Sequence, residues 1–149
     1  MGDDNVWSDE WEPGEDWSGG GGRSKRLARG DVLGASVYEI DPGDFVVYHF
    51  HHGAEEMMIV IRGTPTLRTP EGERVLAEGD VLHFPAGPAG AHAVTNASDA
   101  PARFVMVSDH PSPEVVEYPD LGQITAQART GSQTGERLWL IHDVPQDAG

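Results

Sequence analysis

The amino-acid sequence predicts an all-β protein, either a barrel or a sandwich. Short runs rich in β-branched and aromatic residues recur along the chain, and Gly, Pro and Asp residues separate them. No segment carries a long helical period. Many short strands at this spacing are typical of closed or two-layered β folds. The eight runs are 32–40, 45–51, 56–62, 66–69, 73–77, 80–84, 92–96 and 102–108.

The connections between these runs have the residues that tight turns require. The segment 69–73 (TPEGE) predicts a hairpin turn. Gly43, Gly63 and Gly79 are expected to adopt turn conformations that would strain any other residue. The continuous apolar run 57–61 has a second apolar face that needs a cover, either another sheet or another subunit, and it predicts a homodimer.

The N-terminal part, residues 1–31, is predicted to be an acidic arm followed by a Gly-rich linker. Residues 1–22 contain seven acidic residues and no basic one, and they end in four glycines. Trp7, Trp11 and Trp17 leave two interpretations open. Either the tail is loose and its rings are incidental, or the arm docks its indoles on the domain or on a partner subunit.

The remaining sequence divides into a barrel over residues 32–110 and a C-terminal extension over 111–149 that packs on the barrel. Past residue 110 the chain becomes Pro-rich, and an irregular course is expected there. The segment 137–143 (RLWLIHD) is either a late strand or a docking segment.

Composition narrows the functional classes. A chain of 149 residues is long enough for one sizeable core. Its 25 acidic residues against 10 basic ones give a net charge of −15, which argues against a nucleic-acid partner. The lack of cysteine excludes disulfides, Cys-ligated zinc, iron–sulfur clusters and a thiol nucleophile. Without a long apolar run or a basic start followed by an apolar stretch, the sequence predicts a soluble, cytoplasmic protein with no membrane partner.

The candidate chemistry lies in residues 43–63. In an extended strand, alternate side chains share a face, so His49 and His51 project together and His52 points the other way. A turn after His52 then returns the chain with Glu55 and Glu56. Two imidazoles and one carboxylate from neighbouring strands are ligands that suit a first-row transition metal.

Residues 43–63 resemble the first motif of the cupin superfamily, in which a glycine, two histidines, a glutamate and a second glycine have fixed spacings. Residues 79–96 resemble the second cupin motif, although four residues rather than two separate Gly87 from His92. Residues 113–122 are similar to the tail of small, single-domain cupins of mostly unassigned function. The matching positions are Gly43, His49, His51, Glu56 and Gly63 in the first motif, and Gly79, Pro85, Gly87, His92 and Asn96 in the second.

The resemblance implies a single-domain jelly-roll β-barrel that holds one divalent transition metal. The equivalents of His49, His51, Glu56 and His92 would bind the ion. Zn, Mn, Fe, Ni, Co and Cu all accept such a ligand set, so the sequence leaves the identity of the metal open.

Other titratable residues have less certain roles in the sequence. His52 and Glu55 are either rim residues or partners that orient a metal-bound imidazole. His83 either lines the barrel or faces solvent. Glu55, His52, His83 and Tyr48 are the candidates for moving protons in a reaction.

Two functional hypotheses follow. The first is a metal-dependent enzyme that acts on a small polar molecule, either sugar-like or an organic acid; the resemblance implies isomerisation, epimerisation or, with iron, dioxygenation. The second is a non-enzymatic module that binds a small-molecule ligand. A structural or storage role is disfavoured because a barrel does not need a full ligand set to fold.

Overall fold

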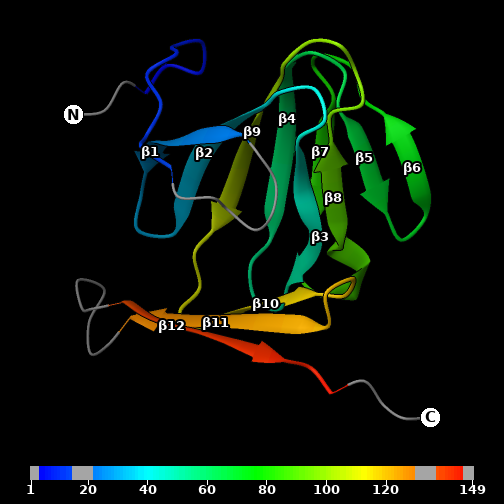
Figure 1. Ribbon diagram of the computed structural model, residues 1–149. Coiled ribbons are helices and arrows are strands. Elements are labelled where there is room, and N and C mark those ends of the chain that lie inside the picture. The colour runs from blue at the N-terminus through cyan, green and yellow to red at the C-terminus, as the bar shows by residue number, and fades with distance from the viewer. Residues whose placement is uncertain (1–3, 15–21, 130–136, 146–149) are drawn as a thin grey trace.

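The computed structural model describes residues 4–14, 22–129 and 137–145, which form two β-sheets packed face to face (Figure 1). The described residues contain no α-helix, only the short 3-10 helix η1 (Pro88–Gly90). They also contain no helix with the length and apolarity needed to cross a membrane. The prediction of an all-β jelly roll is confirmed.

Each sheet is built mainly from antiparallel pairs. The first sheet has the spatial order β1 (Arg23–Arg29), β2 (Leu33–Ile40), β9 (Ala102–Asp109), β4 (Glu56–Arg62) and β7 (Val81–Phe84). The second has the order β12 (Arg137–Asp143), β11 (Gln123–Arg129), β10 (Glu114–Tyr118), β3 (Phe45–His51), β8 (His92–Thr95), β5 (Thr66–Thr69) and β6 (Gly72–Val75).

The eight predicted runs correspond to β2 through β9, with ends that differ by no more than two residues. Alternation of side chains along these strands places one apolar face between the sheets. The predicted turn glycines have positive φ, and a Cβ at Gly63 (φ 81°) would lie 2.7 Å from the carbonyl oxygen of Pro101. The core consists of Ile40, Met58, Val60, Leu67, Leu76, Leu82, Phe84, Val94, Ala102 and Phe104.

Strand β1 lies in a segment for which the sequence analysis predicted no strand. It pairs with β2 in antiparallel register, with Lys25 opposite Val37. Its sequence, RSKRLAR, has no apolar alternation. Backbone pairing with β2 holds the strand, and Arg23 adds ion pairs to Glu39 and Asp41 at 2.5 and 3.2 Å. The division of the chain into arm, barrel and extension stays a prediction.

The expectation of an irregular course past residue 110 was wrong. Strands β10, β11 and β12 extend the second sheet and lie beneath the barrel in Figure 1. The prolines that suggested irregularity stand before β10 and between β10 and β11, at Pro111, Pro113 and Pro119, where they do not interrupt pairing. The strand interpretation of 137–143 is the correct one, because these residues form β12.

Residues 4–14 of the arm contact the barrel of the same chain. The ring of Trp11 lies 4.9 Å from the guanidinium carbon of Arg103, and the ring of Trp7 lies 5.5 Å from that of Arg62. This favours the interpretation in which the indoles dock on the domain. Trp17 lies outside the described residues.

Candidate metal centre

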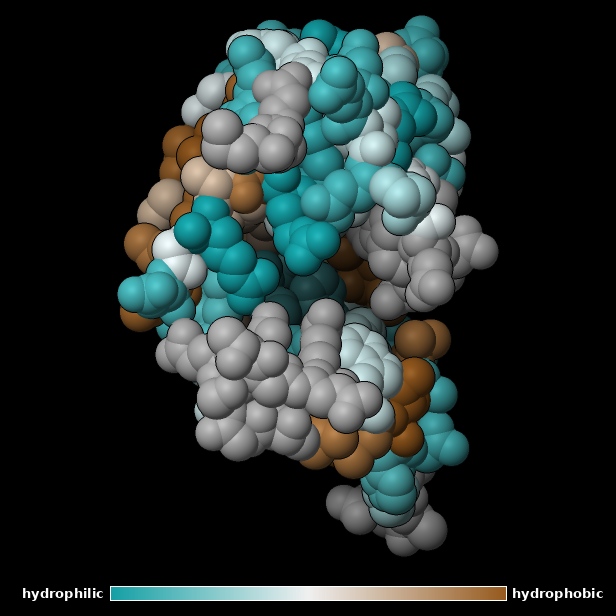
Figure 2. All heavy atoms as spheres, turned by 90° about the vertical axis from the view of Figure 1, so that its left-hand side faces the viewer, coloured by the Kyte–Doolittle hydropathy of each residue, from teal (hydrophilic) through white to brown (hydrophobic). Residues whose placement is uncertain are grey.

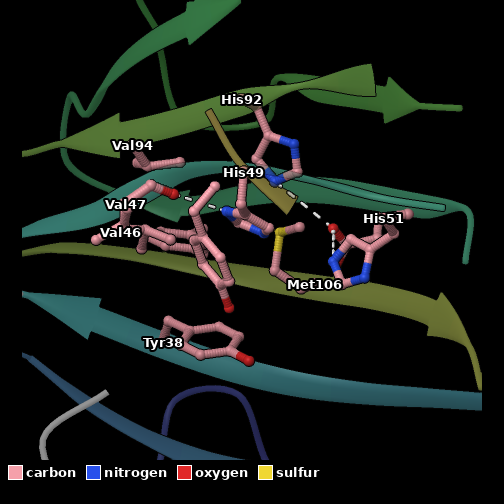
Figure 3. Close-up of a pocket in the computed structure, with 11 residues that line it drawn as sticks. Tyr38, Val46, Val47, His49, His51, His92, Val94 and Met106 are labelled. Carbon is pink, nitrogen blue, oxygen red and sulfur yellow. Dashed lines mark hydrogen bonds and ion pairs between the residues drawn. The ribbon is translucent and has the colours of Figure 1, made fainter. Parts of the chain in front are cut away.

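A cavity of about 190 Å³ lies inside the barrel, between the two sheets. Most of its wall is apolar, and the polar groups gather on one side (Figure 3). Its lining residues are Tyr38, Val46, Val47, His49, His51, Glu56, His92, Val94, Phe104, Met106 and Tyr118.

Three of the predicted ligands meet in this cavity. His49 and His51 come from β3, and Glu56 is the first residue of β4. One ligand atom from each lies within 4.8 Å of the others. His51 Nε2 lies 2.9 Å from Glu56 Oε1. The two-residue period of the strand therefore places both imidazoles inside, as the sequence predicted.

His92 reaches the same cavity in spite of the longer loop before it. It stands opposite His49 in the β3–β8 pair, is 2 % exposed, and has its Nε2 3.6 Å from Glu56 Oε1. The helix η1 takes up the additional residues, and Gly90 packs so closely on Pro85 that no Cβ fits there. The ring of Phe84 stacks on His92, with the centroids 3.8 Å apart.

Backbone carbonyls fix two of the imidazoles in one tautomer. His49 Nδ1 donates to Val47 O at 2.7 Å, and His92 Nδ1 donates to Gly90 O at 2.8 Å. The second nitrogen of each ring is then a free electron-pair donor on the cavity side (Figure 3). Such a backbone contact is how proteins orient a histidine for metal binding.

The electrostatics favour the protonation states that metal binding needs at His49, His92 and Glu56, but not at His51. Burial alone would lower the pKa of His51, but its hydrogen bond to Glu56 and the charges of Glu56 and Glu114 raise it. Burial, together with the neighbouring His92, lowers the pKa of His49 to about 4. Burial also lowers the pKa of His92. Burial alone would raise the pKa of Glu56, but the hydrogen bond from His51 and the nearby imidazoles hold it below its usual value. Neutral imidazoles and an ionised carboxylate are ready ligands.

This donor set fits a divalent transition ion. Three nitrogens and one carboxylate oxygen converge in a buried pocket, and the lack of sulfur ligands leaves the choice among first-row metals open. The structure therefore has a group that could hold a metal, and it does not identify the ion.

The four candidates for proton transfer all lie elsewhere. His52 Nε2 pairs with Glu117 at 2.9 Å on the surface, and His83 pairs with Glu55, both of them exposed. Tyr48 lies under the guanidinium of Arg68, 4.0 Å away. None of these four residues lines the cavity.

The structure instead adds three residues that the sequence analysis missed: Tyr38, Tyr118 and Glu114. Both tyrosines line the cavity, and Glu114 is buried beside His51. Burial, followed by the charge of Glu56, raises the pKa of Tyr38, so its phenol keeps its proton. The period of two in β2 could have indicated Tyr38, whereas the other two belong to β10, which was not predicted.

A wider, polar opening leads to the cavity. It has a volume of about 840 Å³ and shares Tyr38, His51 and Glu56 with the inner cavity. Arg26 and Arg29 of β1 lie along it. Figure 2 shows a hollow on this side of the molecule, with hydrophilic residues along its upper edge.

Fold and site together define a small jelly-roll barrel with a candidate metal centre. Residues 36–108 match the cupin domain family. A solved structure from the cupin superfamily agrees with this fold over most of the chain. The chain therefore contains a cupin domain.

The most similar solved structures include a sugar phosphate isomerase of the cupin superfamily from Silicibacter pomeroyi. It is 26% identical, with a TM-score of 0.71, and the match covers 86% of this chain and 82% of that one. A protein from Acidithiobacillus ferrooxidans, provisionally assigned the same activity, is 26% identical with a TM-score of 0.66, covering 80% and 75%. Among curated proteins, auxin-binding protein ABP19b of Prunus persica is 33% identical over 101 residues. That match covers 58% of this chain, which spans only 44% of the relative's length.

Proposed function

We propose that this protein is a metal-dependent enzyme that acts on a small polar substrate, with His49, His51, Glu56 and His92 as the metal ligands. The observation that carries the proposal is the convergence of these four side chains on one buried cavity. A cavity that opens to solvent leaves room for a substrate oxygen beside the ligands. A bound divalent ion would supply Lewis acidity to that oxygen.

The two cavity tyrosines are the groups that would move protons in such a reaction. Tyr38 stacks on Phe104 with ring centroids 5.6 Å apart, which holds it against the wall. Tyr118 lies on the opposite sheet, with its ring centroid 6.0 Å from that of His49. An isomerisation moves a proton from one substrate atom to another. Tyr38, whose phenol is protonated, could donate a proton to the substrate, and either phenol could relay one by accepting a proton as it gives up its own.

Sugar phosphates are the substrate class that we favour. The relative from Silicibacter pomeroyi is named as a sugar phosphate isomerase and aligns over most of both chains. The inner cavity is small, so only part of a sugar phosphate would enter it, and the phosphate would remain in the wider opening. Arg29 provides a cationic group along that opening, and so does Arg26, which also contacts Glu12 at 3.2 Å.

The experiment combines metal analysis of the purified protein with turnover assays. We expect a divalent transition ion at one per chain, and turnover of aldose or ketose phosphates that exceeds turnover of the same sugars without phosphate. Glu56→Gln should abolish both metal and turnover, whereas Arg29→Ala should raise KM for the phosphorylated substrates only. A protein that binds no divalent ion would contradict the proposal.

A non-enzymatic module that binds a small molecule is the alternative. The similarity to a plant protein named for auxin binding favours it. A ligand that binds at the metal-loaded cavity, is released unchanged and has no turnover would support this alternative over the enzyme.

We further propose that the protein is a homodimer in the cytoplasm. Met57 of β4 and Val81 of β7 are 42% and 59% exposed on adjacent paired strands, and Trp139 and Ile141 of β12 are 53% and 60% exposed. Apolar surface of this kind favours association with a second copy. Light scattering across micromolar concentrations should give twice the chain mass, and a monomer throughout would contradict the dimer.

A further inference from the structure

The carboxylate of Glu114 is buried beside His51, and the function proposed above does not use it. Glu114 begins β10, which pairs with β3 so that Val116 stands opposite His51. The two-residue period puts Glu114 on the same face as Val116. Its side chain is 4% exposed, and its Oε1 lies 3.9 Å from His51 Nδ1.

The backbone around Glu114 holds this carboxylate in place. Its Oε1 accepts the N–H groups of Gly53 and Val115 at 3.2 and 3.1 Å. A Cβ at Gly53 would lie 3.2 Å from Oε2, so a glycine at this position leaves space for the carboxylate. A buried carboxylate is costly unless charged or polar groups compensate it, and these two N–H groups compensate only Oε1.

The three imidazoles of the site differ in one respect. His49 and His92 each donate from Nδ1 to a backbone carbonyl. His51 Nδ1 is buried and has no hydrogen-bond partner within the described part of the chain, and the same holds for Oε2 of Glu114. The two unsatisfied atoms belong to neighbouring side chains, since His51 Nδ1 lies 3.9 Å from the other oxygen of Glu114, Oε1. A metal-bound histidine normally donates its other N–H to a carbonyl or a carboxylate.

We propose that Glu114 is the positioning residue for His51: its carboxylate accepts the Nδ1 proton and keeps Nε2 directed into the cavity. This rests on the proposed metal centre and does not depend on the enzymatic activity. The carboxylate also increases the electron density at Nε2, which strengthens His51 as a ligand. His52 and Glu55, the residues considered for this role from the sequence, instead pair with Glu117 and His83 on the surface.

The first test measures the affinity for Zn²⁺ and for Mn²⁺ by competition with a chromophoric chelator. Glu114→Ala should weaken binding about 10–100-fold, which is typical when a histidine loses its orienting partner. Glu114→Gln should lose less, because its amide oxygen can still accept the proton. Glu117→Ala is the matched control from the same strand. It should bind both ions like the wild type, because the hydrogen bond of Glu117 is to His52 on the surface and not to a proposed ligand.

The second test follows the imidazole protons by ¹H–¹⁵N NMR of the zinc-loaded protein. The wild type should show a slowly exchanging Nδ1 proton on His51. Glu114→Ala should lose that signal and keep those of His49 and His92, whereas a purely structural defect would disturb all three. If Glu114→Ala does not fold, Glu114→Gln and the wild-type spectrum still decide the question.

The outcomes separate the two proposals. Affinities of both Glu114 variants within twofold of the wild type, or an equal loss in Glu117→Ala, would overturn the role of Glu114 alone. A wild-type protein that binds neither ion would overturn the metal centre and this role together.

Discussion

Two regions of the molecule bury charged groups, and they differ in how completely the polar atoms of those groups are hydrogen-bonded within the chain. In the arm clasp, formed by Arg103, Glu39, Asp9 and Trp11, the guanidinium of Arg103 is completely buried. It donates to Glu39 at 2.7 Å, to Asp9 at 2.5 Å and to the carbonyl of Val6 at 2.9 Å. In the cavity, the carboxylate of Glu56 lies 2.9 Å from Nε2 of His51, and Nδ1 of His51 has no hydrogen-bond partner among the residues that the structure describes.

The difference indicates which buried charges serve stability and which serve function. A network that pairs each donor group within the chain holds structure together and needs nothing from outside. A buried cluster with electron pairs directed into a cavity is incomplete, because those groups would be better satisfied by a ligand. We therefore expect substitutions in the clasp to change stability and substitutions in the cavity to change binding.

The largest effect should come from the cavity ligands. His51→Ala and Glu56→Gln should each lower the affinity for a divalent transition ion more than 100-fold, beyond the ~10–100-fold loss expected for an orienting partner. The neighbouring variants His52→Ala and Glu55→Gln are matched controls that should stay loaded, because both residues are exposed. Metal content and chelator competition measure the outcome; an empty site in the controls alone would show that the ligands were assigned in the wrong register.

A substitution in the arm clasp should instead lower the stability of the protein. Arg103→Met should lower the free energy of unfolding by about 3 kcal/mol, near the lower end for breaking a buried ion pair, because Arg23 still contacts Glu39 at 2.5 Å. Metal affinity should not change. Chemical denaturation measures the effect, with Arg62→Met as the exposed control. Loss of metal binding without loss of stability would contradict the comparison.

Deletion of residues 1–22 should have a smaller effect than Arg103→Met. The deletion removes Asp9, Trp11 and the carbonyl of Val6 from Arg103, but water can then reach the guanidinium and replace these partners. Metal affinity should stay at the wild-type level, since none of the proposed ligands lies in the arm. A metal-free protein after the deletion would show that the arm shapes the cavity.

The smallest expected effect is a change in how the stability of the protein depends on pH. The Arg103 guanidinium holds the pKa of Asp9 below its ordinary value of 3.8. Because the folded state lowers this pKa, the interaction stabilises the protein above pH 3.8 and is lost as the pH falls through the folded-state pKa. Asp9→Asn should therefore be slightly less stable than the wild type at neutral pH, and the two should converge in acid. Urea titrations at several pH values test this, and a difference that grows toward low pH would contradict it.

The sequence could predict the part of the molecule in which local pattern and tertiary structure agree. Alternation along β3 was enough to place His49 and His51 on one face, because a strand with one buried face has a defined register. Strands β1 and β10 could not be predicted in this way. Strand β1 has the sequence RSKRLAR, which is rich in charged residues and has no apolar alternation. Strand β10 has the sequence EVVEY, in which two valines are adjacent. Only their pairing with β2 and β3 shows that these segments are strands.

The same limit explains which site residues were missed. Glu114 and Tyr118 enter the site because β10 pairs with β3, a contact that no local motif encodes. His92 could be found only through the resemblance to the second motif. The longer loop before it does not displace it, because the additional residues fold into the helix η1. The proton-transfer candidates near the ligands in sequence lie outside the cavity. His52 and Glu55 stand in the connection between β3 and β4, where strand alternation does not predict the direction of a side chain.

The order of the site residues along the chain has a consequence for biosynthesis. His49, His51 and Glu56 lie within eight consecutive residues, whereas Glu114 follows Glu56 by 58 residues. A ribosome that adds about 5–20 residues per second delivers the first three ligands several seconds before β10 exists. An ion held early by the short segment would sit in a loose, exchangeable complex, and only the arrival of the last strands would slow its exchange. On the proposed metal centre, the ion that the finished protein keeps would then depend on what the cell offers during those seconds as well as on the affinity of the mature site.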